Sequence, residues 1–333
     1  MDAKITKNRL SRMLSYDWLK IVGIAVAVII IWVLIFTMTA TRITCSQSFV
    51  IYNYMGNLSF TNTNFEESYK KAYEKGVFSY EVLEVVPYDL PSSAEYAYTI
   101  MDSHLAADEG DVIFVADIDN PSRSYAKDGE TLYDSYVQSL VGTYEYRLED
   151  LDPYSNSSYF ANMKRYVNSY YKGDYKNNEI DSAKVETDFR TRVKENKDKR
   201  FKKESKIQEG IAKDIQRIQS YRNALIEFYG YLEEGLIRAE RTTVYDHAQN
   251  DKVTFEGVYT LNLCPNPETM GNLVDCVAYR TTFIDESGAT QYSKSAENMH
   301  IAFLHMDATE PGFEFESLLY VNDLIKTYRT VAE

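Results

Sequence analysis

The sequence predicts a single-pass membrane protein whose soluble part is an α/β domain with a mostly parallel sheet and a long helical insertion. Three observations lead to this fold class. An apolar run near the amino terminus is long enough to cross a bilayer, strand and helix patterns alternate over residues 46–129, and helical periodicity dominates residues 130–240. Residues 241–333 return to strands and end in a helix, which completes the α/β domain.

The apolar run extends from Leu19 to Ala40 and carries no charge after Lys20. A helix of about 20 residues, rising 1.5 Å per residue, spans roughly the 30 Å hydrocarbon core of a bilayer. A buried core helix is seldom so uniformly apolar. We therefore expect a transmembrane helix over residues 19–41 that binds the lipid bilayer.

Charges on the two sides of this run predict its orientation. Four basic and two acidic residues precede it and Lys20 lies at its start, whereas Arg42 is the one basic residue directly after it. Residues 1–18 should therefore form a cytoplasmic basic tail, and the domain that follows should be extracellular. The alternative is a cleaved signal peptide, but its apolar core is usually shorter and ends in small residues, so the sequence favours an uncleaved anchor.

The first soluble segment, residues 46–129, reads as β-α-β-α-β. Strands are expected over 48–54, 78–86 and 111–116, and helices over 65–74 and 96–105. The last strand is continuously apolar, as in a parallel sheet that is buried on both faces. Two prolines close the second strand.

The next segment, residues 130–240, is predominantly helical, with almost no helix breakers from Asp181 to Arg238. Isoleucines recur there at steps of three and four residues, which places them on one face of a helix, at Ile207, Ile211, Ile215 and Ile218. This stripe should pack against another helix, either within the chain or in a second copy or partner protein.

The last segment, residues 241–333, contains two expected strands, 254–263 and 276–284, and a further apolar strand within 296–305. An amphipathic helix over 313–328 closes the domain. Cys264 and Cys276 could form a disulfide or remain two buried thiols, because three cysteines are too few for a disulfide scaffold.

The charge of the soluble part excludes some partners. After residue 45 the chain has 30 basic and 48 acidic residues. Such an acidic surface does not attract nucleic acid or anionic lipid, so we expect no nucleic-acid partner.

One string resembles a segment of bacterial extracellular solute-binding proteins. From Ser93 to Asp117 it reads SAEYAYTIMDSHLAADEGDVIFVAD, a helix that ends in an acidic, glycine-containing loop before an apolar strand. In those proteins a proline usually precedes the Asp-Val that begins the strand. Here the proline is absent, and the sequence at this point is Glu109-Gly110-Asp111. The resemblance covers about 70 residues, from Phe49 to Asp117, and implies a membrane-anchored, degenerate relative with a periplasmic-binding-protein-like domain.

The resemblance implies a ligand cleft at the carboxyl ends of the strands, where open parallel sheets also bind ligands for physical reasons. Tyrosine rings can cover the apolar faces of sugars, and carboxylates accept hydrogen bonds from hydroxyl groups. The expected ligand-binding residues are Tyr54, Tyr88, Asp89, Asp117 and Asp119. The function they suggest is non-catalytic binding of a small polar ligand, such as a carbohydrate, or of a partner protein. The alternative is a structural component of a surface complex that assembles through the long helix.

Signals for an enzyme are weak. The chain has no Gly-x-Ser-x-Gly, no phosphate-binding glycine loop and no His-Glu-x-x-His, so no catalytic residue and no cofactor is predicted. His300 and His305 are an odd number of residues apart in an expected strand and should face opposite sides, which argues against a shared metal ion. Residues 117–120 begin like a calcium loop, but Pro121 and Ser122 depart from its pattern, so no metal ligand is assigned.

Overall fold

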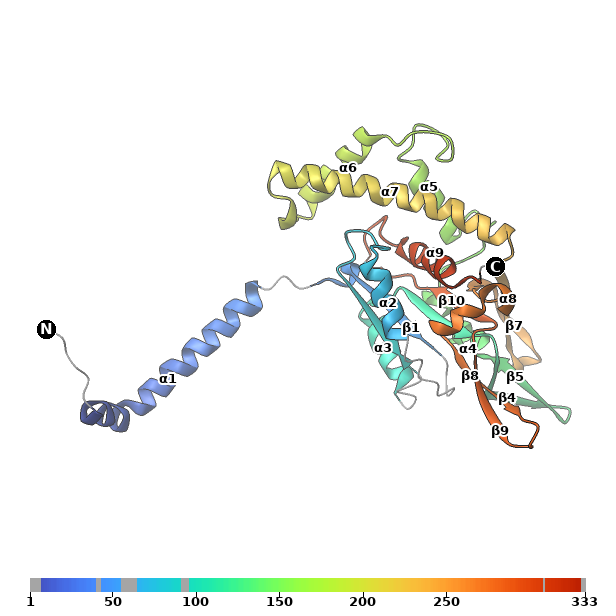
Figure 1. Ribbon diagram of the computed structural model, residues 1–333, viewed down its shortest axis with the longest axis horizontal. Coiled ribbons are helices and arrows are strands. Elements are labelled where there is room, and N and C mark those ends of the chain that lie inside the picture. The colour runs from blue at the N-terminus through green and yellow to red at the C-terminus, as the bar shows by residue number, and fades with distance from the viewer. Residues whose placement is uncertain (1–6, 40–42, 55–64, 91–95, 308, 331–333) are drawn as a thin grey trace. The chain divides into compact units, whose positions relative to one another are not determined.

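The computed structural model describes residues 7–39, 43–54, 65–90, 96–307 and 309–330 (Figure 1). Contacts divide the chain into two units, Met1–Thr44 and Cys45–Glu333. The first unit contains one helix, α1 (Lys7–Thr39). Its segment Trp18–Ile35 is long and apolar enough to cross a membrane, and a signal sequence would have the same character. The ends of the predicted tail and span, residues 1–6 and 40–41, lie outside the described residues.

The second unit is built on a six-stranded sheet with the order β2-β1-β3-β10-β7-β6. The strands are β1 (Ser48–Asn53), β2 (Glu84–Asp89), β3 (Val112–Ala116), β6 (Arg238–Asp246), β7 (Lys252–Asn262) and β10 (Met299–Phe303). Strand β1 pairs in parallel with β2 and β3, whereas β10 is antiparallel to β3 and β7, and β6 is antiparallel to β7. Strands β1, β2, β3 and β7 therefore point the same way, which confirms a mixed α/β fold with a mostly parallel sheet.

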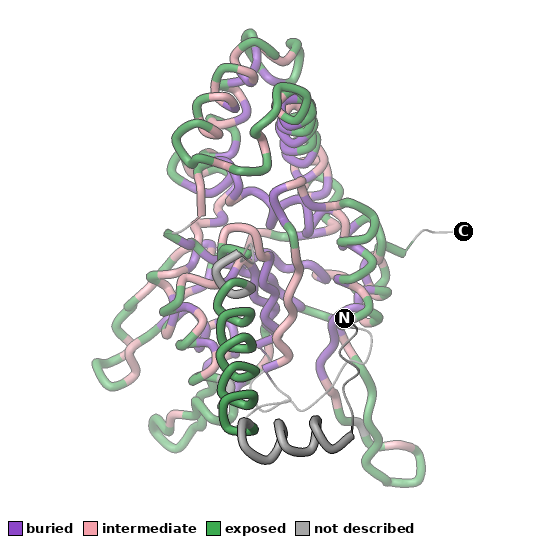
Figure 2. Tube along the Cα trace, turned by 90° about the vertical axis from the view of Figure 1, so that its left-hand side faces the viewer, coloured by how far each residue is buried: buried purple, intermediate pink, exposed green. Residues whose placement is uncertain are grey.

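Helices cover both faces of the sheet. On one face, α2 (Phe65–Glu74) and α9 (Glu316–Tyr328) pack on a core that includes Phe49 and Ile51 of β1. On the other face, α3 (Ala97–Ala106) and α4 (Tyr136–Tyr144) pack on a core that includes Val50 and Tyr52. Successive residues of a strand point to opposite faces, so β1 contributes to both cores. Figure 2 shows the buried residues concentrated along these central strands.

The predicted β-α-β-α-β order of residues 46–129 is confirmed, and α2 has the predicted bounds. The predicted strand over residues 78–86 is wrong at both ends, because β2 is Glu84–Asp89 and contains Pro87. Strand β2 lies at the edge of the sheet and pairs with β1 alone. A proline, which has no N–H to donate, is tolerated in such an edge strand. The first residues of the string used for the resemblance, 93–95, lie outside the described residues.

The helical segment is less uniform than predicted. It begins with strand β5 (Glu130–Ser135) and helix α4, which packs directly on the sheet. Helices α5 (Tyr159–Asn168), α6 (Ser182–Glu195) and α7 (Glu204–Glu233) follow, so the segment from Asp181 to Arg238, expected to have almost no helix breakers, contains two separate helices and the start of β6. Helix α7 contacts α5, α6 and α9, and Figure 1 shows it lying over α9.

The isoleucine stripe of α7 packs within the chain. Ile218 is fully buried in the same core as α9, and Ile215 packs against that core. Ile211 is 6% exposed, and Ile207 is half-buried. Since the inner part of the stripe is covered by the protein itself, it offers little free surface to a partner.

Two hairpins and one short helix complete the described part of the domain. The hairpins are formed by β4 (Asp119–Lys127) with β5 and by β8 (Tyr279–Ile284) with β9 (Thr290–Ser295), and α8 (Pro267–Met270) lies between β7 and β8. The sequence analysis did not predict β4, whose residues are mostly exposed. None of the three cysteines forms a disulfide; Cys264 and Cys276 are buried, and Cys45 is exposed.

Two glycines of α7 should respond in opposite ways to replacement by alanine. A Cβ at Gly210 would lie 2.7 Å from Cε1 of Phe201 and would also overlap the ring of Phe189, whereas a Cβ at Gly230 meets no atom within 4 Å. We expect Gly210→Ala to destabilise the domain by about 1–2 kcal/mol, because overpacking outweighs the gain in helix propensity. Gly230→Ala should stabilise it by about 0.5–1 kcal/mol. Urea unfolding of both variants measures this, and equal effects would contradict the packing around Gly210.

Candidate ligand-binding site

A pocket of about 230 Å³ lies at the edge of the sheet where β3 ends. Its walls come from the turn after β3, the end of β5, the start of α4, and strands β6 and β10. The side chains that matter for its chemistry are Asp117, Asp119, Gln138, Glu240, Arg241 and His300.

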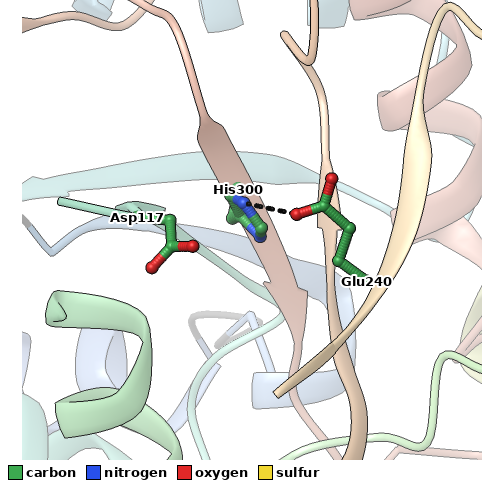
Figure 3. A group of neighbouring side chains, drawn as sticks. All are labelled: Asp117, Glu240 and His300. Atoms are coloured by element: carbon green, nitrogen blue, oxygen red, sulfur yellow. Dashed lines mark ion pairs between the residues drawn. The ribbon is translucent and has the colours of Figure 1, made fainter. Parts of the chain in front are cut away.

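The topology brings these side chains to one face and one edge of the sheet. Asp117 follows the carboxyl end of β3, while β10 and β6 run the opposite way and begin at the same edge. His300 pairs with Val115 of β3, and Glu240 pairs with Thr260 of β7. Asp117, Glu240 and His300, which we call the acidic–histidine trio, each offer one ligand atom, and these atoms lie within 4.8 Å of one another. Figure 3 shows Asp117, from the turn after β3, and Glu240, from β6, on opposite sides of the His300 side chain of β10.

His300 is the buried member of the trio and is 2% exposed. Its Nδ1 lies 2.8 Å from Oγ1 of Thr260, whereas its Nε2 has no hydrogen-bond partner and lies 3.7 Å from Oε2 of Glu240. Burial lowers the pKa of His300 to about 4, although the nearby charge of Asp117 acts in the other direction. The imidazole is therefore neutral at neutral pH and can carry a lone pair on Nε2.

The two carboxylates of the trio are more accessible, and asparagines hold the side chain of Glu240 and the backbone of Asp117. Nδ2 of Asn262 donates to Glu240, with 3.3 Å between Nδ2 and Oε1, and also to Oδ1 of Asn298, at 3.1 Å. The backbone N–H of Asp117 donates to the carbonyl oxygen of Asn298, at 2.9 Å. Asn298 has a φ of 51°, a left-handed conformation that asparagine tolerates better than most residues, and it turns the chain into β10. The turn at Asn298 thus helps to position both Asp117 and, through Asn262, Glu240.

The opposite wall of the pocket is the first turn of α4, which is fixed in two ways. Ser135 and Gln138 form a capping box, and Nε2 of Gln138 donates to the carbonyl oxygen of Thr243 on β6. The turn after β3 is tied to α4 through Asn120, whose Nδ2 donates to Oγ of Ser139 at 3.1 Å. The walls are therefore joined by hydrogen bonds, and the pocket is part of the folded core.

The pocket is electronegative. Asp117, Asp119 and Glu240 line it together with one arginine, Arg241, and this guanidinium is paired with Glu256 at 3.0 Å. An excess of carboxylate oxygens attracts cations and accepts hydrogen bonds from hydroxyl and amino groups. The arrangement is thus suited to a cation, an amine or a hydroxyl-rich solute.

Two of the five predicted site residues line this pocket, and three lie elsewhere. Asp117 and Asp119 are exposed in its wall. Tyr54 is buried, with its hydroxyl 3.1 Å from that of Tyr98. Tyr88 stacks on Tyr52, and Asp89 accepts a hydrogen bond from Nδ2 of Asn53, at 2.9 Å. These three belong to the ends of β1 and β2, on the other side of β3 from the pocket. The segments that follow these ends, residues 55–64 and 91–95, lie outside the described residues.

The sequence analysis missed Glu240 as a site residue and assigned His300 no metal. Glu240 lies in β6, a strand that was not predicted, and only the sheet order brings it close to His300. His300 stands out in the sequence as the single polar residue of an otherwise apolar strand, which could have signalled a special role. His305 lies beyond β10, is exposed, and has its Nδ1 2.9 Å from Oε1 of Glu149.

Comparison of the chain with protein-family models, with curated proteins and with solved structures gives no match.

Proposed function

We propose that this protein is a membrane-anchored, non-catalytic binding module that holds a small polar ligand in the pocket at the carboxyl edge of its sheet. The observation that carries the proposal is the pocket itself, where polar side chains from several parts of the fold meet around an open volume of about 230 Å³. Binding at the carboxyl ends of parallel strands is the common arrangement in open α/β sheets.

The anchor and its orientation belong to the same proposal. Helix α1 supplies an apolar segment long enough to cross a bilayer, and basic residues predominate on its amino-terminal side. The binding domain would then stand outside the cell, with residues 1–18 in the cytoplasm. In this proposal the protein is a degenerate, single-domain relative of bacterial extracellular solute-binding proteins at the cell surface.

The charges of the pocket favour some classes of ligand over others. Three carboxylates against one paired arginine favour an amine or a polyhydroxyl compound such as a carbohydrate over an anion. Assembly through the isoleucine stripe was the other function considered, but Ile211 and Ile218 are buried within the chain. We therefore propose ligand binding, and not assembly through this stripe, as the function.

Two matched asparagine substitutions test where the ligand binds. Asp119→Asn removes a pocket charge outside the acidic–histidine trio, and Asp89→Asn makes the same change at the end of β2. For a solute found by thermal-shift screening of sugars, amines, amino acids and peptides, Asp119→Asn should weaken binding about 5- to 150-fold, the equivalent of 1–3 kcal/mol. Asp89→Asn should leave the affinity unchanged.

Isothermal titration of the full-length protein in detergent measures both affinities. The reverse result, with Asp89→Asn weakening binding and Asp119→Asn having no effect, would place the ligand at the β1–β2 end. If no solute in the panel raises the melting temperature, the binding function is wrong.

A further inference from the structure

The starting point is the unpartnered ring nitrogen of His300. The side chain is 2% exposed, and its Nε2 forms no hydrogen bond. When Nδ1–H donates to Thr260, across the 2.8 Å between them, the lone pair of Nε2 points toward the carboxylate of Glu240. Nε2 and the carboxylates of Asp117 and Glu240 are then three acceptors close together, and Nε2 receives no hydrogen bond. A cation resolves this arrangement.

The spacing of the trio is close to that of a metal site. Nε2 of His300 and Oε2 of Glu240 are 3.7 Å apart, and all three ligand atoms lie within 4.8 Å of one another. In a tetrahedral site with bonds of 2.0–2.2 Å, two ligand atoms are about 3.4 Å apart. Small rotations of the two carboxylates would reach this spacing, and Asp117 is exposed enough to make one. Figure 3 shows the carboxylate of Asp117 on one side of the His300 ring and that of Glu240 on the other.

The neighbours of the trio are those that support metal ligands. Thr260 can fix the tautomer of His300 that leaves Nε2 free, and Asn262 donates to the carboxylate of Glu240. Neither neighbour is charged, so one neutral imidazole and two carboxylates carry a net charge of about −2, which a divalent ion balances.

We propose that Asp117, Glu240 and His300 bind one divalent transition-metal ion, with zinc as the best match. One imidazole nitrogen and two carboxylate oxygens form a mixed nitrogen–oxygen ligand set that suits zinc, whereas magnesium and calcium prefer oxygen ligands alone. Three protein ligands leave one coordination position open toward the pocket. The inference rests on the proposed function, because a polar ligand in the pocket would donate an oxygen or nitrogen to this position.

Titration of the metal-free protein tests the proposal. Full-length protein in detergent is treated with EDTA, exchanged into metal-free buffer, and titrated with zinc, manganese, magnesium and calcium in a calorimeter. We expect one equivalent of zinc to bind more tightly than magnesium or calcium. Asp117→Asn and His300→Gln should each weaken zinc binding by at least about 100-fold, since loss of a ligand costs more than loss of a supporting neighbour. Asp89→Asn, which makes the same change outside the pocket at the end of β2, should change zinc affinity less than about twofold.

Asp117→Asn alters an exposed side chain and keeps the test valid if His300→Gln fails to fold, which circular dichroism would show. Cobalt gives a second readout, because a tetrahedral cobalt site has visible absorption that both variants should lose. Absence of zinc binding, or zinc binding that both variants retain, would overturn the proposal. A solute that binds equally well after EDTA treatment would support the polar-ligand pocket and contradict the metal site. If the protein binds zinc but no solute of the panel, the metal site would be supported and the polar-ligand pocket contradicted.

Discussion

Replacement of Arg217 by methionine should lower the free energy of unfolding of the domain by about 3–5 kcal/mol. The guanidinium is 2% exposed and makes contacts with four groups. Nε donates to Asp214 at 2.9 Å, Nη2 donates to the hydroxyl of Tyr166 at 2.8 Å, Nη1 donates to the carbonyl oxygen of Gly312, and the group lies over the ring of Phe313. Methionine would leave the carboxylate of Asp214, the carbonyl oxygen of Gly312 and the partly buried hydroxyl of Tyr166 without this donor. The cost of such unmet groups exceeds the gain from an apolar side chain.

Arg190→Met is the matched control in the neighbouring helix α6. Its guanidinium also pairs with carboxylates, those of Glu186 and Glu204, but the side chain is 37% exposed. Water replaces such contacts at little cost, so this variant should lose far less stability than Arg217→Met. Urea unfolding of the Cys45–Glu333 unit measures both variants. Similar losses for the two would contradict the buried network around Arg217.

The second large effect concerns α1. The full-length chain should remain in the membrane fraction after an alkaline carbonate wash, and protease added to intact, wall-stripped cells should digest all but about the first 40 residues. The physical reason is an apolar segment of bilayer length with basic residues on its amino-terminal side. A chain that begins at Cys45 should be soluble. Recovery from cells of a mature soluble protein that begins near Thr44 would show instead that the segment is a cleaved signal peptide.

The parts of the fold that sequence patterns predict are those with strong local periodicity. Helix α2 was predicted with its observed bounds, and β3 was recognised as a continuous apolar run. The sequence predicts that β2 ends before Pro87, so the predicted strand lies too early in the chain. The observed strand includes Pro87 because an edge strand tolerates proline. Strands β4 and β6 carry mostly polar, partly exposed residues and have no local signal that separates them from loops.

The residues of the candidate site could likewise be predicted only where a local sequence pattern marks them. Asp117 and Asp119 could be predicted because they follow an apolar strand of a recognisable α/β pattern. Their partners Glu240 and His300 could not, because antiparallel β10 lies between β3 and β7, and no local pattern gives this strand order. The isoleucine stripe was read correctly as a packing face, but only the tertiary structure shows that its inner residues, such as Ile218, are covered by the chain itself.

A crystal structure of the Cys45–Glu333 unit, grown with zinc and with the solute that gives the largest thermal shift, tests the central claim most directly. Data collected at the zinc absorption edge locate the metal independently of the solute. The account predicts solute density in the pocket between α4 and the ends of β3, β6 and β10, with an anomalous peak among Asp117, Glu240 and His300. An empty pocket, with the solute bound beside Tyr88 and Asp89 or nowhere in the domain, would contradict it.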